Sequence, residues 1–299
     1  MAKGSWVTEF PDMERSDLIL LRKTLDGAYR EFSREYGDFI ESFFDPLLSF
    51  LLWFENLLIS SPWWLILAAI GGMTYTASRS LKLCTGVVGA MLAIGYFGMW
   101  EDTMRTLSII TVCTLLSIFL GVPTGIAMAR SNRVQKVVTP MLDVMQTMPA
   151  FVYLIPVVML LGIGKIPGVI AVVIYAIPPV IRLTNLGIRL VDKDVLEAAT
   201  AYGASSWQRL WDVQLPLAMP NIMAGINQTI MMALAMVVIA SMIGVKGLGQ
   251  PVLKSITNQY FTLGVLNGLA IVTLAIIFDR VSQAYARRMQ QHLGGAEHV

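Results

Sequence analysis

The sequence predicts an all-α, polytopic bundle of membrane-spanning helices. Of its 299 residues, 56% are hydrophobic and only 14% are charged, and the mean hydropathy is +0.65. This balance lies outside the range of ordinary soluble domains. The apolar segments are continuous and lack the two-residue alternation of a membrane β-barrel, so helices must satisfy the backbone inside the bilayer.

Long intervals without a charged residue mark the individual spans. Most of them reach the roughly 18–20 residues that a helix needs to cross the ~30 Å hydrocarbon core. They lie between Glu55 and Arg79, Lys82 and Glu101, Arg105 and Arg130, Asp143 and Lys165, Asp212 and Lys246, and Lys254 and Asp279. We therefore predict spans near 62–78, 83–100, 105–129, 141–163, 166–182, 219–244 and 262–279.

A further segment near 44–60 is apolar but contains Asp45 and Glu55. It could lie in the membrane interface as an amphipathic helix or cross the bilayer as a short span, and we favour crossing. The total is then about seven to eight transmembrane helices. We expect residues 1–42 to form a cytoplasmic or interfacial segment, residues 43–284 the transmembrane domain and residues 285–299 a tail.

Basic residues in short connections set the orientation, because such connections tend to stay in the cytoplasm. The connections that follow 62–78 and 105–129 are basic, whereas the one between them carries Glu101 and Asp102. The connection over 183–218 is again basic. This alternation places 183–218 and the C-terminal tail on the cytoplasmic side.

Residues 192–216 form a patterned segment within this connection, with "EAATAYGASSWQRLWDVQLP" at 197–216. Good helix formers run through Val195–Tyr202, Gly203 interrupts them, and Ser205 or Ser206 suits the N-cap of a second short helix. We expect two short helices joined by a glycine hinge. The alternative is a solvated loop that merely connects two spans.

The surface of this segment suits a close contact with another protein. Three alanines allow another backbone to approach, and two tryptophans four residues apart share one face of the second helix. Two prolines then suit the turn into the next span and its first turn. These residues are Ala198, Ala199 and Ala204, then Trp207 and Trp211, then Pro216 and Pro220.

The segment resembles the EAA loop of ABC importer permeases. Glu197-Ala198-Ala199, three residues, Gly203, nine residues and Val213-Gln214-Leu215-Pro216 depart from that pattern only where Val213 replaces Ile. The stretches 139–158, 178–189, 214–244 and 247–253 are similar to the permease subunits of glycine betaine/proline betaine-type importers, which carry quaternary amines. The likeness covers roughly residues 80–285.

The resemblance implies a type I ABC importer permease fold in the bacterial cytoplasmic (inner) membrane. It implies two copies of a separate ATP-binding subunit, which uses ATP and Mg, an extracytoplasmic substrate-binding protein, and a second copy of this chain around a shared path. The cargo would be glycine betaine or a related amine: choline, carnitine, proline betaine or trimethylamine N-oxide. The residues expected to contact the ATPase or to form the coupling loop are Glu197, Ala198, Ala199, Gly203, Ala204, Trp207, Leu215 and Pro216.

The residues themselves predict no catalysis, no cofactor and no metal site in this chain. No stretch matches the phosphate-binding pattern G-x-x-x-x-G-K-[ST]: around Gly164-Lys165, Met159 replaces the first glycine and Ile166 the hydroxyl residue. Both histidines lie in the polar tail, which excludes histidine pairs inside the membrane. Cys84 and Cys113 suit apolar packing positions. We expect membrane lipid but no nucleic acid among the partners.

Few residues suggest the translocation path. Asp143 is the main candidate for a functional carboxylate, against the alternative of a helix-start carboxylate favoured by the helix dipole. Phe151, Tyr153 and Tyr175 could hold a quaternary ammonium group by cation–π attraction, although aromatic residues in membrane helices more often pack. Asn227 could line the path or join helices by hydrogen bonds.

The alternative function is an ion-coupled secondary transporter for a small amine or amino acid. Such a carrier would have similar hydropathy but should carry several charges at membrane depth.

Two pairs of glycines suit tight packing between helices, because they put small residues on helix faces. They are Gly121/Gly125 and Gly86/Gly89.

Overall fold

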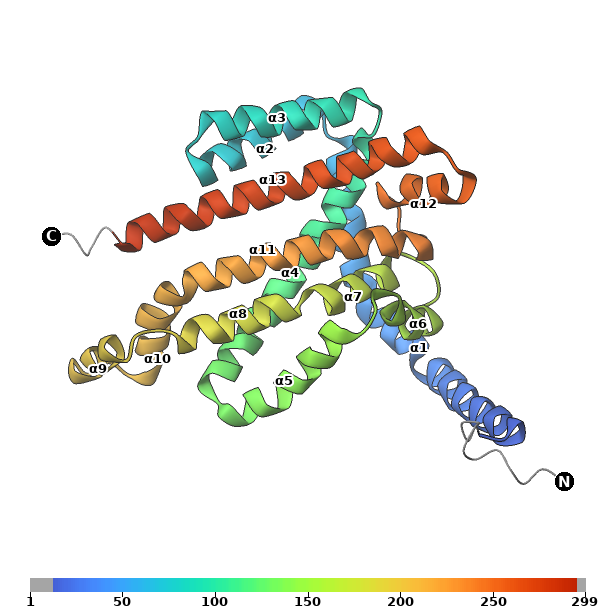
Figure 1. The fold of residues 1–299 in the computed structure, drawn as a ribbon, viewed down its shortest axis with the longest axis horizontal. Helices are drawn as coiled ribbons and strands as arrows, with labels where there is room; N and C mark the ends of the chain where they lie inside the picture. The colour runs from blue at the N-terminus through green and yellow to red at the C-terminus, as the bar shows by residue number, and fades with distance from the viewer. Residues whose placement is uncertain (1–12, 295–299) are drawn as a thin grey trace, which may run out of the picture.

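A computed structural model of the protein describes residues 13–294. All regular structure in that range is helical (Figure 1). The α-helices are α1 Arg15–Ser60, α2 Trp63–Ser78, α3 Leu81–Tyr96, α4 Trp100–Arg130, α5 Asn132–Thr147, α6 Ala150–Leu161, α7 Lys165–Ala176, α8 Pro178–Arg189, α9 Lys193–Ala201, α10 Ser206–Gln208, α11 Leu215–Ala240, α12 Gly249–Asn258 and α13 Phe261–Gly294. A π-helix η1 (Arg209–Gln214) and a 3₁₀ helix η2 (Ser241–Ile243) flank α11.

Five helical stretches in the described range are long and apolar enough to cross a membrane, or six if the bent pair α5 and α6 counts as one. They are Ser42–Ser60, Trp100–Arg130, Lys165–Arg189, Ser206–Ile243 and Phe261–Arg288. The predicted spans near 62–78 and 83–100 form as α2 and α3, each of 16 residues. At ~1.5 Å per residue each of these helices rises only ~24 Å, less than the thickness of the hydrocarbon core. For this reason fewer helices are long enough to cross the membrane than the seven to eight predicted.

The span predicted near 141–163 does not form one straight helix. Its residues belong to α5 and α6, whose axes are bent by 101° at the break between Thr147 and Ala150. Met148 has an extended backbone (φ −69°, ψ 133°) and Pro149 follows it. A residue before proline avoids the helical region, so α5 ends at Thr147. Pro156 lies inside α6 without ending it.

The connection predicted over 183–218 is shorter than expected, because α8 stays helical to Arg189 and a new helix starts at Ser206. Together α7 and α8 form one stretch, Lys165–Arg189, and most of its apolar part is buried inside the protein. In Figure 1, α8 runs between α4, α5 and α11, and it contacts all three. The α7–α8 stretch is therefore the centre of the bundle.

Glycines allow the backbones around α8 to approach closely. A Cβ on Gly121 or Gly125 of α4 would lie 2.4 Å from Val180 or 2.6 Å from Thr184, both on α8. On the other side of α8, a Cβ on Gly225 of α11 would lie 3.0 Å from the Val180 Cα. The predicted tight packing is confirmed for Gly121/Gly125, whereas Gly86 and Gly89 face no other atom within 4 Å.

Helix α1 is a single helix of 46 residues that runs across the other long helices in Figure 1. It contacts α4, α6 and α7, and Leu51 is fully buried there. The helix continues through residue 42, so the predicted boundary between the N-terminal segment and the transmembrane domain falls inside one element. Likewise α13 passes residue 284 and ends at Gly294, and 295–299 lie outside the described residues.

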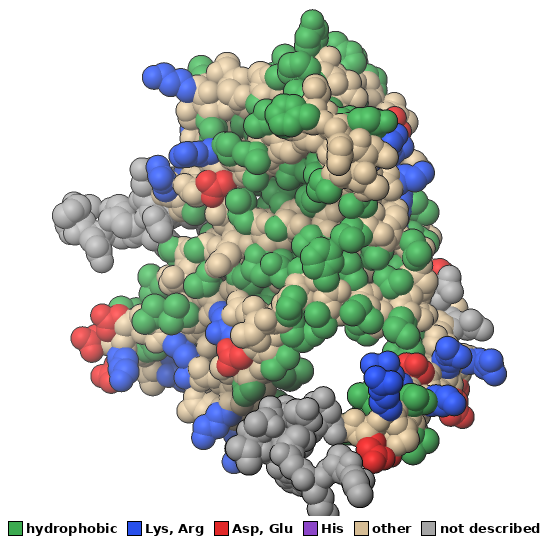
Figure 2. Space-filling view, turned by 45° about the vertical axis from the view of Figure 1, so that its right-hand side comes forward, with side chains coloured by type: hydrophobic (Ala, Val, Ile, Leu, Met, Phe, Trp, Pro, Cys, Tyr) green, Lys and Arg blue, Asp and Glu red, His purple; other side chains and the backbone are tan. Residues whose placement is uncertain are grey.

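Hydrophobic side chains cover the middle of the face shown in Figure 2, with the charged side chains gathered mainly around its margins. Exposed apolar residues on α6 and α13 contribute to such surfaces, among them Phe151, Ile155, Leu269 and Val272. Exposed apolar surface of this extent is expected where lipid, rather than water, surrounds the helices.

Candidate coupling site and translocation path

The two-helix prediction for residues 192–216 is confirmed, with the hinge at Gly203. Helix α9 begins at an Asp192 N-cap and ends at Ala201. Gly203 then has a positive φ of 85°, a conformation that glycine adopts without the steric cost of a Cβ. Ser205, rather than Ser206, caps α10: its Oγ accepts from the Gln208 N–H (3.3 Å), and its own N–H donates to Gln208 Oε1 (2.8 Å).

Two arginines hold the short helices in place. The Arg209 guanidinium donates from η1 to Thr200 Oγ1 on α9 at 2.9 Å, so the helices on both sides of the hinge are linked. Arg130, at the end of α4, lies over the Trp207 ring at 5.7 Å from its centroid, a cation–π geometry. The segment is thus a folded unit attached to α4.

The two tryptophans share a face as predicted, with the centroids of Trp207 and Trp211 5.7 Å apart. Trp207 is 59% exposed and Tyr202 is 94% exposed. Glu197, Ala198 and Gly203 are also exposed, whereas Ala199 and Ala204 are half-buried. The unit therefore presents a surface of small and aromatic side chains.

Buried leucines attach this surface to the bundle. Leu210 is 1% exposed and Leu215 is 8% exposed, and both pack with Ile188, Ala218 and Ile222 of α8 and α11. The turn predicted at Pro216 does not form: α10, η1 and α11 follow one another without a non-helical residue. Pro216 lies within this helical run, where the π-helix η1 passes into α11. The coupling unit is therefore continuous with a span.

Arg189 joins the start of this region to the end of α4. Its guanidinium donates to the Met128 carbonyl at 2.8 Å and to Asn132 Oδ1 at 2.9 Å, and its Nε donates to Asn185 Oδ1 at 3.0 Å. Capping the last carbonyls of α4 with a cation is favourable. This clamp fixes α8 against the α4–α5 connection.

The aromatic candidates for the path do not form one site. Tyr153 and Tyr175 meet edge to face with centroids 6.0 Å apart. Tyr153 is only 6% exposed, and its hydroxyl donates to the Met145 carbonyl, which joins α6 to α5 across the bend. Phe151 is exposed and makes no ring contact with either tyrosine. Tyr153 thus stabilises the α5–α6 bend, and the role of the three aromatic residues in the path stays a prediction.

Asp143 does not lie at a helix start. It is in the last two turns of α5, and its carboxylate forms an ion pair with Arg182 of α8. A carboxylate near the C-terminus of a helix is unfavourable with respect to the dipole, so the guanidinium is the group that offsets it. Both side chains are partly exposed to solvent.

Asn227 joins two spans, one of its two predicted roles. Its amide Nδ2 donates to Asp279 Oδ1 at 2.9 Å, and its Oδ1 accepts from Ser282 Oγ at 2.6 Å. Asp279 also accepts from Gln283 at 2.7 Å. Beside this network lies a hollow of about 450 Å³ between α11 and α13, lined in part by Asn227, Ser282 and Gln283.

Sequence reasoning missed a buried ion-pair network around Glu55. The Glu55 side chain is 8% exposed and accepts from Lys165 Nζ of α7 at 2.6 Å. Arg105 Nε of α4 lies 3.8 Å from the other oxygen, and Arg105 also pairs with Glu101 and Asp102. Glu55 thus joins α1 to the two central helices α4 and α7. Its position inside an otherwise apolar segment was the only signal.

Comparison with known proteins decides the family. Residues 121–291 match the family model described as a binding-protein-dependent transport system inner membrane component. The chain belongs to this family. Membership confirms the predicted location in the inner membrane.

Curated permeases share extended similarity with this family member. It is 54% identical over 198 residues to the glycine betaine/proline betaine transport system permease protein ProW of Escherichia coli, covering 66% of this chain and 56% of ProW. The chain thus spans little more than half of ProW. It is 42% identical over 272 residues to the glycine betaine transport system permease protein OpuAB of Bacillus subtilis, covering 91% of this chain and 96% of OpuAB.

The fold is also found in a solved structure, the MetNI methionine ABC transporter in an inward-facing conformation. The match has a TM-score of 0.57 at 18% identity and covers 62% of this chain and 93% of the solved one. The predicted fold class, an all-α membrane bundle of the type I ABC importer kind, is confirmed.

Proposed function

We propose that this chain is the membrane subunit of an importer for glycine betaine or a related quaternary or methylated amine. The observation that carries the proposal is the exposed, folded unit α9–α10 with its EAA pattern, attached to the spans through Leu210 and Leu215. The permeases ProW and OpuAB, named for glycine betaine transport, support the cargo class.

In the proposed assembly, partner proteins hydrolyse ATP and deliver the amine, and this chain provides the membrane path. Two copies of an ATP-binding subunit hydrolyse ATP with Mg and dock on α9–α10, using Glu197, Ala198, Gly203 and Trp207 of this chain. An extracytoplasmic binding protein delivers the amine. Two copies of the permease enclose the path between them.

Coupling follows from the continuity of the helices. A docked ATPase would displace α9 and α10 together, because Arg209 links them across the hinge. The displacement reaches α11 directly, since α10, η1 and α11 form one helical run. It reaches α4 through the Arg130–Trp207 contact. A shift of short rigid helices that repacks the spans is a known route between two conformations.

Substitution Gly203→Asp tests this coupling. A Cβ at Gly203 meets no atom within 4 Å, but φ is +85°, so the folded protein should lose only about 1–2 kcal/mol to backbone strain. The added side chain stands in the docking surface. We expect normal membrane insertion, a small loss of thermal stability, and loss of amine uptake and of ATPase stimulation by the loaded binding protein.

Gly98→Asp is the matched control. Gly98 also has a positive φ (76°) and open space around a Cβ, but it lies between α3 and α4, away from the docking surface. We expect the same small loss of stability with coupling retained. Normal uptake by inserted Gly203→Asp protein, or equal uncoupling by both variants, would count against the coupling role.

A further inference from the structure

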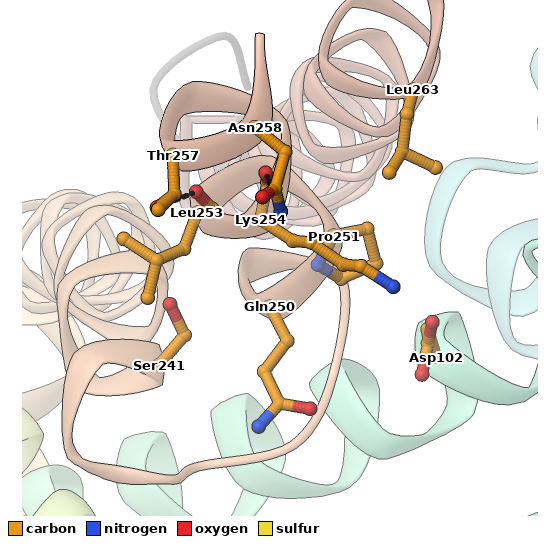
Figure 3. A pocket seen from close by; sticks show the side chains of 9 residues that line it. All are labelled: Asp102, Ser241, Gln250, Pro251, Leu253, Lys254, Thr257, Asn258 and Leu263. Carbon is orange, nitrogen blue, oxygen red and sulfur yellow. Dashed lines mark hydrogen bonds between the residues drawn. The ribbon is translucent and has the colours of Figure 1, made fainter. Parts of the chain in front are cut away.

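An open cavity of about 580 Å³ lies where α12 folds back beside the start of α4. Its position at the Asp102 end of α4 puts it on the side opposite the coupling unit, as Figure 1 shows for α12 and α9. Figure 3 shows its lining: Asp102, Ser241, Gln250, Pro251, Leu253, Lys254, Thr257, Asn258 and Leu263.

Close backbone contacts hold α12 in place. A Cβ on Gly247 would lie 2.5 Å from Thr106 Oγ1 of α4, and that hydroxyl accepts from the Leu248 N–H at 2.9 Å. A Cβ on Gly249 would lie 2.9 Å from the Val238 Cα of α11, and one on Gly264 of α13 would lie 2.4 Å from Ser255 Oγ. The walls of the cavity are thus fixed against three spans.

The lining carries opposite charges that do not pair with each other. Asp102 uses its Oδ1 to accept from Arg105 at 3.1 Å, which leaves its second oxygen for another partner. Lys254 forms no ion pair with a described residue, and Gln250 makes no side-chain hydrogen bond there. In Figure 3 the Lys254 side chain extends toward the end of α4 that bears Asp102.

The hydroxyl and amide donors of the other polar lining residues already bond to nearby backbone carbonyls. Ser241 Oγ donates to the Val238 carbonyl at 2.6 Å, Thr257 Oγ1 to the Leu253 carbonyl at 3.0 Å and Asn258 Nδ2 to the Lys254 carbonyl at 3.1 Å. The groups left to act on a ligand are therefore the ammonium of Lys254, the carboxamide of Gln250 and the carboxylate of Asp102. Two donors for an anion and one anion for a cation suit a small zwitterion.

We propose that this cavity is a reception site for a small zwitterion with one carboxylate and one cationic amine. Lys254 and Gln250 bind the carboxylate, and Asp102 faces the cationic group. The volume lies in the range of small-molecule sites. Because Lys254 is exposed to solvent, its attraction for the carboxylate is screened and the affinity of the site is low. Low affinity suits a site that must release its ligand inward. The inference rests on the proposed function and names where the amine first meets the permease.

Direct binding of glycine betaine to the solubilised full-length permease tests the site without its partners. Saturation-transfer NMR on the N-methyl protons gives the apparent Kd, and choline, which lacks the carboxylate, is the comparison ligand. We expect Lys254→Gln to weaken betaine binding about 3- to 10-fold and to leave choline unchanged. Asp102→Asn should weaken both ligands.

Two control variants make the result specific. Lys254→Arg keeps the cation and should bind betaine as wild type does. Lys246→Gln removes an exposed lysine from the preceding turn that does not line the cavity, and it should have no effect. Absence of saturable betaine binding by wild type, or equal binding by Lys254→Gln, would overturn the site.

Transport by the complete complex separates this site from the proposed function. If wild type imports betaine and Lys254→Gln impairs only stimulation by the loaded binding protein, with no betaine binding to the permease alone, the cavity is a protein contact and the inference is wrong. If wild type imports no amine, the proposed function itself fails.

Discussion

Substitution Gly125→Ala should destabilise the bundle at its centre. A Cβ at this position would lie 2.7 Å from the Ile181 carbonyl oxygen and 2.6 Å from the Thr184 Cβ of α8. Neither atom belongs to a flexible side-chain end, so α4 and α8 must separate. Overpacking of this kind costs typically about 1–3 kcal/mol, and the backbone contact places it toward the upper end.

The helix propensity of alanine acts in the opposite direction by about 1 kcal/mol. The net expectation for Gly125→Ala is a loss of about 1–2 kcal/mol, or a fall of several degrees in Tm at ~2–4 °C per kcal/mol. Gly86→Ala is the control, because a Cβ there meets nothing within 4 Å. That variant keeps only the gain in propensity and should be as stable as wild type or more so.

The assay is loss of the monodisperse peak in size-exclusion chromatography after heating the detergent-solubilised protein. The expected result is a lower midpoint for Gly125→Ala and an unchanged or higher one for Gly86→Ala. Equal midpoints for the two variants would refute the close approach of α4 to α8 as the basis of the packing.

Two further predictions concern polar links between helices, measured by the same thermal assay. Glu55→Gln removes the charge that pairs with Lys165 at 2.6 Å and should cost about 1–3 kcal/mol; a midpoint like that of wild type would show that α1 is held by apolar contacts alone. Asn227→Leu removes the hydrogen bond to Asp279 and one from Ser282, each worth about 1 kcal/mol, and an unchanged midpoint would contradict the link between α11 and α13.

Local signals in the sequence predicted the coupling unit well. The hinge at Gly203 and a serine cap depend on neighbouring residues only, and both form as expected. The structure chose Ser205 over Ser206 because Gln208 lies three residues after Ser205 and completes the reciprocal pair.

Prolines were harder to interpret. Pro149 separates two helices, whereas Pro123, Pro140 and Pro156 lie inside helices. In membrane proteins, neighbouring groups can satisfy the carbonyls that a proline leaves free, so the outcome depends on tertiary contacts. The break after Met148 is accompanied by such a contact, the hydrogen bond from Tyr153 to the Met145 carbonyl.

Long-range pairs could not be predicted from one sequence. Glu55 meets a lysine 110 positions away, and Asp143 meets Arg182 39 positions away. Periodicity indicates which face of a helix is apolar, but it carries no information on which charges meet across helices. Nor does it show which glycines meet another helix: a Cβ on Gly125 would lie against α8, whereas one on Gly86 would meet no atom within 4 Å.

The central claim is that ATP drives amine import through this permease. The most direct measurement is uptake of radiolabelled glycine betaine and choline into proteoliposomes that contain the permease with its cognate ATPase, with and without internal ATP and external binding protein. We expect uptake only when ATP and binding protein are both present. Uptake driven by an ion gradient without ATP would contradict the account, and α9–α10 would then be only a folded connection between spans.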